Sequence, residues 1–309
     1  MHYFLVYNKT SGNHRSFTLV RKIKESLVEC GHRVFCLSTK YKGHASELTS
    51  SIARKYGKRA TVIVFGGDGT VSEAVSGLVG TETPLMVIPC GSGNDFAKKL
   101  YGRKFTAESV AERLGLLGGN LQYSVKAIDT INANGHSCVN VLSVGFDTIV
   151  ETKAHKLLRR FPFLGKHAYS LAIVLALFGK RTFEYKVLGK NGENDLMLPE
   201  KLAVILLALC NASFYGGGYC PAPESDLSDG ILDLVYVDPV SLLKIAQLIG
   251  PYSKGEASSF NEVHEFKVTE LTIAGICEKV LYNCDGENYL EDSVYIRIVP
   301  ESLNLCIPT

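Results

Sequence analysis

The chain has 309 residues, 46% of them hydrophobic and 21% charged, which is typical of a folded globular protein long enough for two domains. Its 33 Lys and Arg residues are balanced by 31 Asp and Glu residues, so the net charge of +2 excludes the basic surface typical of nucleic-acid binding. Nine cysteines without a CxxC pair indicate buried thiols in a reducing cytoplasm, neither a zinc site nor a disulfide framework.

No membrane-spanning segment is expected. Residues 1–7 are too few for a signal peptide and lack its basic flank. The longest apolar run, Tyr169 to Phe178, has ten residues, and a spanning helix needs roughly 20. We therefore expect a cytoplasmic protein.

The first part of the chain alternates apolar strands with segments of helical periodicity. Strands are expected at residues 3–7, 33–37, 62–65 and 85–88. After the first strand, Leu19, Ile23 and Leu27 recur at helical spacing before Gly31 ends the segment. This alternation predicts a doubly wound parallel α/β domain with right-handed crossovers.

Polar or glycine-rich turns follow all four strands. Glycines let backbone N–H groups approach a ligand, and a helix N-terminus favours phosphate. Because the carboxyl ends of parallel strands share one edge of a sheet, we expect a phosphate-binding site there. The candidate residues are Asn8, Ser11, Gly12, Thr39, Gly66, Gly67, Asp68, Gly69, Thr70, Val71, Ser72, Ser92 and Asn94. The alternative is ordinary loop structure, in which Thr39 and Ser92 only cap the helices that follow.

Asp68 is the acidic residue of the third turn and has no basic neighbour in sequence. A carboxylate among backbone donors suits Mg²⁺ or the hydroxyl groups of a nucleotide. The alternative is an Asp that only forms the turn.

After residue 120 the pattern changes to consecutive strands with short turns. Residues 123–132 and 137–144 flank Asn134-Gly135, the favoured pair for a two-residue hairpin. Further strands are expected at 183–188, 202–209, 231–237, 265–273, 280–283 and 294–299, and a helix at 240–249. This pattern predicts an antiparallel β-sandwich. We expect an α/β domain over 1–122, completed by 299–309, and a sandwich domain over 123–298.

Two acidic turns lie in the second domain. Asp285-Gly286-Glu287 follows an expected strand and places two carboxylates on a tight turn, where one could accept a proton from an attacking hydroxyl. Residues 226–231 form a compact acidic loop after three glycines. The alternatives are an ordinary Asp-Gly hairpin and a solvated acidic turn.

Residues 153–190 contain nine basic residues against the single acid Glu184, interleaved with aromatic and aliphatic side chains. Such a segment can lie at an anionic bilayer surface. An equally good interpretation is a buried helix with a solvated basic face.

Six motifs in order resemble the soluble diacylglycerol kinase catalytic family, which includes bacterial lipid kinases and is related to sphingosine and ceramide kinases. They are Gly66-Gly67-Asp68-Gly69-Thr70, Gly91-Ser92-Gly93-Asn94-Asp95-Phe96-Ala97, Gly145-Phe146-Asp147, Gly216-Gly217-Gly218 with Pro221-Ala222, Asp229-Gly230 with Asp233, and Asp285-Gly286-Glu287. The resemblance covers nearly the whole chain. It implies an ATP-NAD kinase and phosphofructokinase-like first domain, and phosphoryl transfer from ATP to a lipid hydroxyl, with diacylglycerol the leading acceptor and phosphatidic acid the product.

The resemblance also assigns roles to residues. It implies nucleotide contacts at the turn residues of the first domain, catalysis in the cleft between the domains by Asp285 and Glu287 with Asp68, and a structural Mg²⁺ held by Asp226, Asp229 and the main chain of Ile231. It implies peripheral contact with the inner membrane face. Which of Asp285 and Glu287 takes the proton, and whether the protein is a homodimer, stay open.

Two positions depart from the family pattern. Lys9 stands where the first turn usually has Pro, and Ser72 stands where Asn usually follows the Gly-Gly-Asp-Gly-Thr motif by two residues. Two other functions remain as alternatives. One is a kinase of a soluble acceptor such as NAD, which shares Gly-Gly-Asp-Gly-Thr, and the other is a nucleotide-binding regulatory module without turnover.

Overall fold

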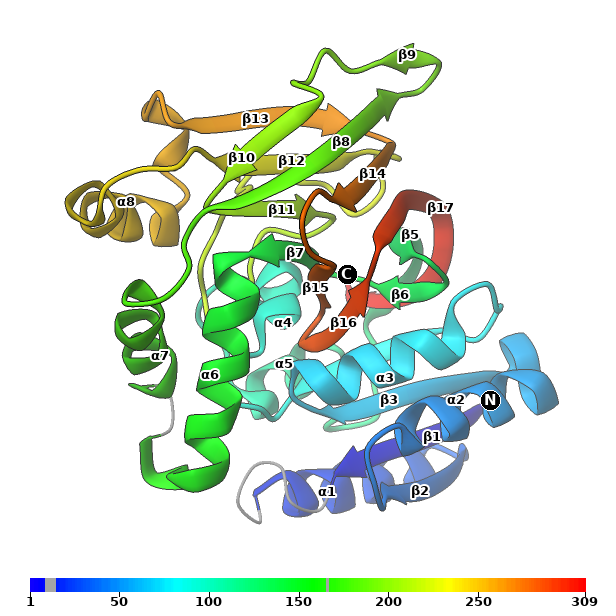
Figure 1. Ribbon diagram of the computed structural model, residues 1–309. Coiled ribbons are helices and arrows are strands. Elements are labelled where there is room, and N and C mark those ends of the chain that lie inside the picture. Colours follow the sequence, from blue (N-terminus) through cyan, green and yellow to red (C-terminus); the bar gives the residue numbers. More distant parts are fainter. Residues whose placement is uncertain (9–14, 165–166) are drawn as a thin grey trace. The chain divides into compact units, whose positions relative to one another are not determined.

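The computed structural model describes residues 1–8, 15–164 and 167–309 (Figure 1). The described chain divides into two compact units. Unit 1 consists of Met1–Thr130 and Pro300–Thr309, and unit 2 of Ile131–Val299. The chain passes from one unit to the other within two strands, β5 (Tyr123–Ala133) and β17 (Ser293–Pro308). From the sequence we expected divisions after residues 122 and 298.

Unit 1 is built on a parallel sheet, as predicted. Its strands lie in the order β4-β3-β1-β2, and the last part of β17 runs parallel to β4. The register pairs Asn8 with Thr39, Tyr7 with Phe65, and Gly66 with Pro89. The carboxyl ends of the four strands therefore lie along one edge. The strands are β1 (His2–Asn8), β2 (Arg33–Thr39), β3 (Ala60–Gly66) and β4 (Leu85–Pro89).

Helices cover both faces of this sheet. The apolar stripe of α1 packs with α4 and α5 on Tyr3, Leu5 and alternate residues of β3 and β4. The intervening side chains, such as Phe4 and Val6, are also buried and belong to the face on which α2 and α3 pack. The helices are α1 (Arg15–Glu29), α2 (His44–Tyr56), α3 (Asp68–Leu78), α4 (Asp95–Tyr101) and α5 (Ala107–Arg113), with a short 3₁₀ turn, η1 (Gly57–Arg59).

Unit 2 is an antiparallel β-sandwich, which confirms the predicted class. One sheet has the order β13-β12-β11-β7-β15-β16, and the other includes β10-β8-β14 and the first part of β17. Apolar side chains from both sheets, such as Leu207 and Ile273, form one buried core between them. The first sheet contains β7 (Val141–Gly145), β11 (Leu206–Cys210), β12 (Leu232–Val237), β13 (Val263–Val268), β15 (Val280–Cys284) and β16 (Glu287–Glu291).

The second sheet of unit 2 is completed by shorter strands. Asn134 and Gly135 both have positive φ and join β5 to β6, which confirms the predicted two-residue turn. The remaining strands are β6 (His136–Cys138), β8 (Phe183–Asn191), β9 (Asn194–Asp195), β10 (Lys201–Val204) and β14 (Glu270–Gly275).

Within the described residues, three helices and two 3₁₀ turns accompany the sandwich. The helices are α6 (Phe146–Arg160), α7 (His167–Leu177) and α8 (Leu242–Lys254), and the turns are η2 (Pro162–Leu164) and η3 (Ala257–Ser259). The buried small residues Ala154, Ala172 and Ala176 allow α6 and α7 to approach closely. The Ser241 hydroxyl caps α8 by accepting a hydrogen bond from the N–H of Lys244, which confirms the predicted helix.

Three predicted strands of unit 2 were wrong because each changes sheet halfway. Residues 137–144 divide into β6 and β7, residues 202–209 into β10 and β11, and residues 265–273 into β13 and β14. At the first break the backbone N–H groups of Val139 and Asn140 bind the Asp285 carboxylate. Each segment keeps strand-forming residues on both sides of the break, so the sequence pattern does not mark it.

The described residues contain no helix that is long and apolar enough to cross a membrane. All nine cysteines are free, and five of them are buried: Cys138, Cys210, Cys220, Cys284 and Cys306. Cys30, Cys36 and Cys277 are exposed, so the expectation of buried thiols was wrong for these three. For Cys36 the reason is its place on β2, which is an edge strand.

Candidate active site

The loops that follow β3 and β4 in unit 1 cross at two glycines. A Cβ atom on Gly91 would lie only 2.4 Å from the Cα of Gly67. A Cβ atom on Gly93 would lie 2.7 Å from Oδ2 of Asp68. Heavy atoms cannot approach each other this closely, so Gly91 is required for the backbone contact with Gly67, and Gly93 leaves room for the Asp68 carboxylate.

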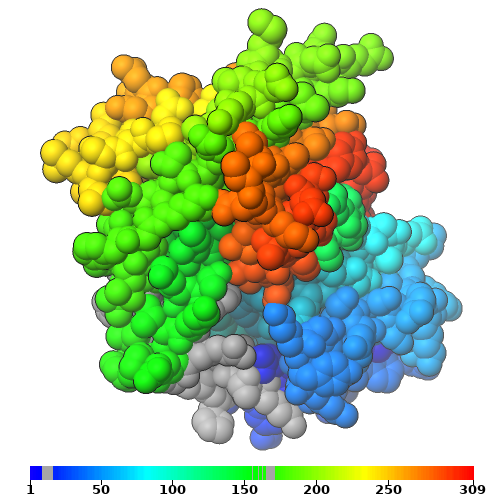
Figure 2. All heavy atoms as spheres, viewed as in Figure 1, coloured from blue at the N-terminus to red at the C-terminus, as the bar shows by residue number. Residues whose placement is uncertain are grey.

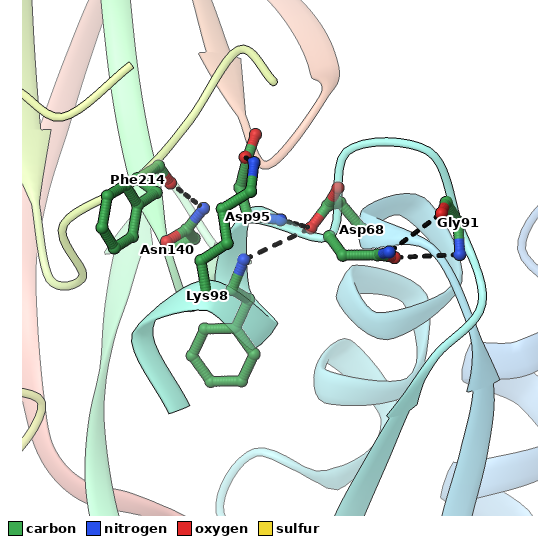
Figure 3. A network of polar contacts seen from close by, with 8 residues as sticks. Asp68, Gly91, Asp95, Lys98, Asn140 and Phe214 are labelled. Carbon is green, nitrogen blue, oxygen red and sulfur yellow. Dashed lines mark hydrogen bonds and ion pairs between the residues drawn. The ribbon is translucent and has the colours of Figure 1, made fainter. Parts of the chain in front are cut away.

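The Asp68 carboxylate joins the same two loops. Its Oδ1 accepts hydrogen bonds from the backbone N–H groups of Asp95, at 2.6 Å, and Phe96, at 3.3 Å, where α4 begins (Figure 3). Burial and the neighbouring charge of Asp95 raise the pKa of Asp68, and the backbone hydrogen bonds lower it. Asp68 therefore positions the start of α4 as well as carrying a charge at the edge of the sheet.

Two further side chains hold the loop after β4. Asn94 has a φ of 52°, and it accepts a hydrogen bond from the N–H of Gly91 at 2.9 Å and donates one to the Gly91 carbonyl at 2.8 Å. Lys98 forms an ion pair of 2.6 Å with Asp95, whose side chain is buried. Both interactions shape the loop on which the predicted nucleotide contacts of Ser92 and Asn94 depend.

The capping alternative for Thr39 and Ser92 was wrong. The N-cap of α2 is Gly43 and the N-cap of α4 is Asn94. Thr39 instead ends β2 beside Asn8, at the carboxyl edge. Ser92 is exposed. Both hydroxyl groups thus lie at the edge where the predicted phosphate site is, and their binding role stays a prediction.

The turn from β3 into α3 contains the other predicted nucleotide residues. Gly66 cannot carry a side chain, because a Cβ atom there would lie 2.5 Å from the Cβ of Thr70. Gly69 has open space around it. Val71 and Ser72 are buried in the first turns of α3. At these two positions a ligand can therefore contact only backbone groups or the Ser72 hydroxyl. Ser11 and Gly12 lie outside the described residues.

In unit 2, Asp285 and Gly286 form the two-residue turn between β15 and β16. Their φ angles are 47° and 96°, and Cys284 pairs with Glu287 across the turn. These angles define a type I′ hairpin, for which Asp-Gly is a preferred sequence. The structure thus agrees with the hairpin interpretation, and a catalytic role remains compatible with it.

Backbone N–H groups surround the Asp285 carboxylate. Its Oδ2 accepts a hydrogen bond from Val139 at 2.7 Å, and its Oδ1 accepts from Asn140 at 3.1 Å and Val141 at 3.2 Å. The Cys138 thiol also donates to Oδ1, at 3.1 Å. Burial raises the pKa of Asp285 and these four donors lower it. With one donor on Oδ2, that oxygen retains capacity to accept a proton.

Asn283 fixes the other side of the turn. Its Oδ1 accepts a hydrogen bond from the N–H of Gly286 at 2.9 Å, and its Nδ2 donates to Asn288 at 2.8 Å. Asn288 in turn donates to Oγ1 of Thr152 on α6, at 3.0 Å. The side chain of Glu287, at the end of the turn, is partly exposed. The acidic turn is therefore held rigidly against α6.

Two acidic residues of α6 were missed as site residues, although Asp147 belongs to a motif noted in the sequence. Asp147 and Glu151 are four residues apart, so they share one face of the helix. Oδ1 of Asp147 accepts a hydrogen bond from the N–H of Thr148 at 3.0 Å. Its Oδ2 is buried and has no hydrogen-bond partner in the part of the chain that the structure describes.

The pKa values of both of these carboxyl groups are raised. Burial raises the pKa of Asp147 to about 7, although the side chains of Tyr215 and Ser143 lie close enough to lower it. Burial, followed by the charges of Asp147, Asp285 and Glu287, raises the pKa of Glu151 to about 8. At mildly acidic pH both carboxyl groups therefore hold protons, and near neutral pH a large fraction of each does, so that each can donate a hydrogen bond in that form.

An apolar cavity of about 120 Å³ adjoins this face of α6. Its walls are formed mainly by apolar side chains of α6, α7, α8 and neighbouring strands, among them Phe146, Val150, Ile173, Ile245 and Leu248, with Asp147 and Glu151 as its acidic lining residues. Its volume is comparable with that of an engineered cavity of roughly 150 Å³ that binds benzene. The cavity can therefore hold part of a hydrocarbon chain.

The acidic loop predicted to bind Mg²⁺ is exposed at both carboxylates. Asp226 accepts hydrogen bonds from the N–H and hydroxyl of Ser228, at 2.9 and 3.0 Å, and Asp229 accepts one from the N–H of Ile231, at 3.0 Å. Among the described residues, no three His, Cys, Asp or Glu side chains converge on a metal position. The Mg²⁺ role of this loop stays a prediction.

The described part of the region 153–190 contains the second half of α6, η2, α7 and all but the last residue of β8. The outer side of α7 is apolar and exposed, at Leu171, Val174 and Leu175, and Phe178 follows with 85% of its surface exposed. Lys156 and Arg160 of α6 are exposed as well. The green spheres of this region form part of the surface in Figure 2. The buried-helix interpretation therefore does not describe α7.

Two known protein domains match successive parts of the chain. Residues 2–128 match the diacylglycerol kinase catalytic domain, and residues 140–307 match the YegS C-terminal NAD kinase beta sandwich-like domain. A diacylglycerol kinase of Mycobacterium tuberculosis is 29% identical over 247 residues, covering 80% of this chain and 76% of that protein. A YegS-like lipid kinase of Chromohalobacter salexigens is 30% identical over 256 residues, covering 81% of this chain and 76% of that protein.

Solved structures agree on the fold. A crystal structure of a Bacillus anthracis protein matches with a TM-score of 0.76 at 24% identity, over 98% of this chain and 96% of that chain. A second structure, of a diacylglycerol kinase from the same organism, gives a TM-score of 0.70 at 22% identity, over the same shares of both chains.

A parallel α/β unit with glycine loops, followed by an antiparallel sandwich with an acidic turn, defines a class of kinases. The chain belongs to the diacylglycerol kinase-like family of lipid kinases. The resemblance seen in its sequence motifs is thereby confirmed.

Proposed function

We propose that this protein uses ATP and Mg²⁺ to phosphorylate the hydroxyl group of diacylglycerol, giving phosphatidic acid. The observation that carries the proposal is in unit 2, where Glu151 both lines the apolar cavity and contacts the acidic turn. Oε1 of Glu151 lies 3.4 Å from the position that a Cβ atom on Gly286 would occupy. A cavity for hydrocarbon next to carboxylates that can accept a proton suits an alcohol attached to an acyl chain.

Asp285 and Glu287 act on the acceptor hydroxyl in this proposal. One carboxylate receives the hydroxyl proton as the hydroxyl oxygen attacks the γ-phosphorus. The bond between the γ-phosphorus and the oxygen that bridges it to the β-phosphate breaks, and ADP leaves with that electron pair. The N–H groups of residues 139–141 hold Asp285 in a single orientation. A fixed acceptor lowers the cost of orienting the reacting groups.

Unit 1 binds the nucleotide in this proposal. The carboxyl ends of β1 to β4 and the start of α3 offer backbone N–H groups and the hydroxyls of Thr39, Thr70 and Ser92 to the phosphates. Asp68 stands at the N-terminus of α3, and its hydrogen bonds to the start of α4 hold together the two loops that carry these donors. The departures from the family pattern, at Lys9 and Ser72, leave polar groups at both positions.

Mg²⁺ fits the oxygen groups present in both units. Asp226, Asp229 and the Ile231 carbonyl would hold one ion, because all three offer oxygen and both carboxylates are exposed to water, which Mg²⁺ largely retains. Asp68 would serve the nucleotide's ion. A bound Mg²⁺ supplies positive charge that offsets the phosphate charge.

The exposed apolar side of α7 is proposed to meet the inner membrane face. Its side chains, with Phe163 and Phe178, would enter the interface, while Lys156 and Arg160 meet anionic headgroups. Diacylglycerol resides in that bilayer, so contact there brings the enzyme to its substrate.

A soluble acceptor such as NAD is the second candidate function. It is favoured by one observation, the match of residues 140–307 to a sandwich described as NAD kinase-like. The apolar lining of the cavity argues against it, since a dinucleotide needs polar partners.

Product analysis tests the proposal. The purified protein is incubated with labelled ATP and Mg²⁺, together with vesicles containing dioleoylglycerol or with NAD. Thin-layer chromatography should show labelled phosphatidic acid that is absent without Mg²⁺. A labelled dinucleotide with unlabelled lipid would contradict the proposal and support the second candidate. Nucleotide binding with neither product would indicate a regulatory module.

A further inference from the structure

The N-terminus of α2 receives a hydrogen-bond acceptor from a neighbouring helix. The N-cap residue of α2 is Gly43, which has no side chain to accept from the first N–H groups of the helix. Oε2 of Glu73, on α3, instead accepts a hydrogen bond from the N–H of Ala45 at 3.1 Å. Because Ala45 is fully buried, water does not reach this N–H, and the carboxylate supplies the partner that a buried N–H requires.

Glu73 is the second carboxylate of α3 that binds the start of another helix. Asp68, five residues earlier, accepts hydrogen bonds from the N–H groups at the start of α4. Since α3 begins directly after the glycine turn of β3, its two carboxylates tie the segments that follow β2 and β4 to the turn that follows β3. Glu73 also places a negative charge at the N-terminus of α2, where the helix dipole favours it.

Contacts within the loop between β2 and α2 carry this restraint to Thr39. The N–H of Lys40 donates a hydrogen bond to Nδ1 of His44 at 3.1 Å. The N–H of His44 donates to the carbonyl of Tyr41 at 3.2 Å, and the two rings stack with 4.6 Å between their centroids. The loop is thus bound to the first turn of α2, and Thr39, which precedes the loop, ends β2 at the carboxyl edge of the sheet.

Close packing fixes α2 against α3. The hydroxyl of Thr49 is buried and donates a hydrogen bond to the carbonyl of Ala74 at 3.2 Å. A Cβ atom on Gly77 would collide with the Thr49 hydroxyl and with the carbonyl of Ser46, so the two helices approach closely at this glycine. This packing brings the side chain of Glu73 within reach of the first turn of α2.

We infer that Glu73 is a positioning residue for the nucleotide, because it holds the loop 40–43, and with it the hydroxyl of Thr39, in the conformation that receives ATP. The inference rests on the proposed function, in which Thr39 contacts the phosphates. A loop that is ordered in advance does not have to be ordered by the ligand, so the affinity is higher. Without the Glu73 carboxylate, part of the free energy of ATP binding would go into ordering the loop.

Three variants of the full-length protein test this. Glu73→Met removes the acceptor at similar length and helix propensity, and Glu73→Gln keeps an oxygen that can accept. Thr83→Val is the matched control, because Thr83 is buried and donates to the carbonyl of Gly57 at 2.9 Å. Both of these residues lie before the first residues of β3 and β4, at the opposite edge of the same sheet. Circular dichroism verifies that each variant is folded.

Nucleotide affinity is the first measurement. In calorimetry, Glu73→Met should bind MgADP roughly tenfold more weakly than the wild type, the value of about one good hydrogen bond. Glu73→Gln should stay within about threefold of the wild type, because it loses only the charge that the helix dipole favours. Thr83→Val should bind as the wild type does. In kinase assays Glu73→Met should raise the KM for ATP and leave kcat and the KM for the lipid near their wild-type values.

Hydrogen exchange locates the effect in the loop. In Glu73→Met without nucleotide, the backbone amides of residues 40–45 should exchange roughly tenfold faster than in the wild type. Saturating MgADP should slow them again, since the bound nucleotide then orders the loop. A cap that only stabilises the fold would not give a local change that the nucleotide reverses.

The outcomes separate this inference from the proposed function. An unchanged MgADP affinity in Glu73→Met would overturn the inference, and so would an equal loss in Glu73→Gln or Thr83→Val. Unchanged exchange of residues 40–45 in Glu73→Met would overturn it too. If affinity and exchange change as expected and no phosphatidic acid forms, the inference stands and the proposed function fails. A wild type that binds no nucleotide would overturn both.

Discussion

The thiol of Cys138 donates a hydrogen bond to Oδ1 of Asp285 over 3.1 Å. This contact lowers the pKa of the carboxyl group, which burial raises. Cys138→Val removes the donor at similar volume, so the acidic limb of the kcat profile should move up by about half a pH unit. Cys138→Ser keeps a donor and should leave the limb in place. Equal profiles for all three proteins would show that Asp285 does not titrate in the reaction.

Substitutions at Asp285 and Glu287 should differ in their effect on the free energy of unfolding. In Asp285→Asn an amide NH₂ would face backbone N–H groups, which should cost about 2 to 3 kcal/mol of unfolding free energy and abolish turnover. Glu287→Gln removes the charge of a partly exposed residue and should change stability by less than about 0.5 kcal/mol. Urea unfolding and lipid kinase assays compare them. Full turnover in one variant would assign the base to the other residue.

The crossing of two glycine loops gives a prediction about nucleotide binding. Gly91→Ala introduces a Cβ atom 2.4 Å from the backbone of Gly67, so the loops must separate and ATP affinity should fall at least tenfold. Gly250→Ala, on α8 of unit 2, is the matched control, because no atom lies within 4 Å of its Cβ position. Fluorescent nucleotide titration measures both. Unchanged affinity in Gly91→Ala would separate this crossing from the nucleotide site.

The raised pKa values on α6 predict how stability depends on pH. Folded Asp147 and Glu151 hold their protons up to about 7 and about 8, whereas unfolded carboxyl groups release them near 4, at roughly their reference pKa values. Their contribution is therefore complete at acidic pH and is lost as the pH rises through that window. Asp147→Asn should raise the unfolding free energy by about 1 to 2 kcal/mol at alkaline pH, and by little at about pH 5. If thermal melts show the same difference between the wild type and Asp147→Asn at about pH 5 and at alkaline pH, this pH dependence is refuted.

Local sequence patterns were sufficient for the α/β unit. Leu19, Ile23 and Leu27 are all buried on α1, as their spacing predicts. The polar turns lie at one edge because parallel strands place their carboxyl ends together. Strand hydrophobicity and glycine turns are local signals, so they can be read without tertiary contacts.

The sandwich was predictable in class but not in strand boundaries. Residues 137–144 read as one strand, since nothing in their hydrophobicity marks the change of sheet at Val139. The cause of the break is Asp285, about 145 residues further along the chain. Contacts over such a separation do not leave a periodic pattern in sequence.

The α6 carboxyl pair shows why part of the site was missed. Asp147 stood in a motif, but acidic residues on a helix are usually solvated. The raised pKa values of Asp147 and Glu151 depend on the walls of the cavity, which come from α7, α8 and loops distant in sequence. Similarly, Gly67 was expected to admit a ligand, whereas a Cβ atom at that position would meet Gly91 of the neighbouring loop.

The proposed reaction is transfer of the γ-phosphate of ATP to the hydroxyl of diacylglycerol. The most direct measurement is mass spectrometry of lipids after incubation with ATP that carries heavy oxygen in its γ-phosphate, Mg²⁺ and dioleoylglycerol vesicles. We expect phosphatidic acid that carries the heavy oxygen atoms of the phosphate, and none with Glu287→Gln and Asp285→Asn combined. Heavy oxygen found only in inorganic phosphate or in a dinucleotide, with the lipid unlabelled, would contradict it.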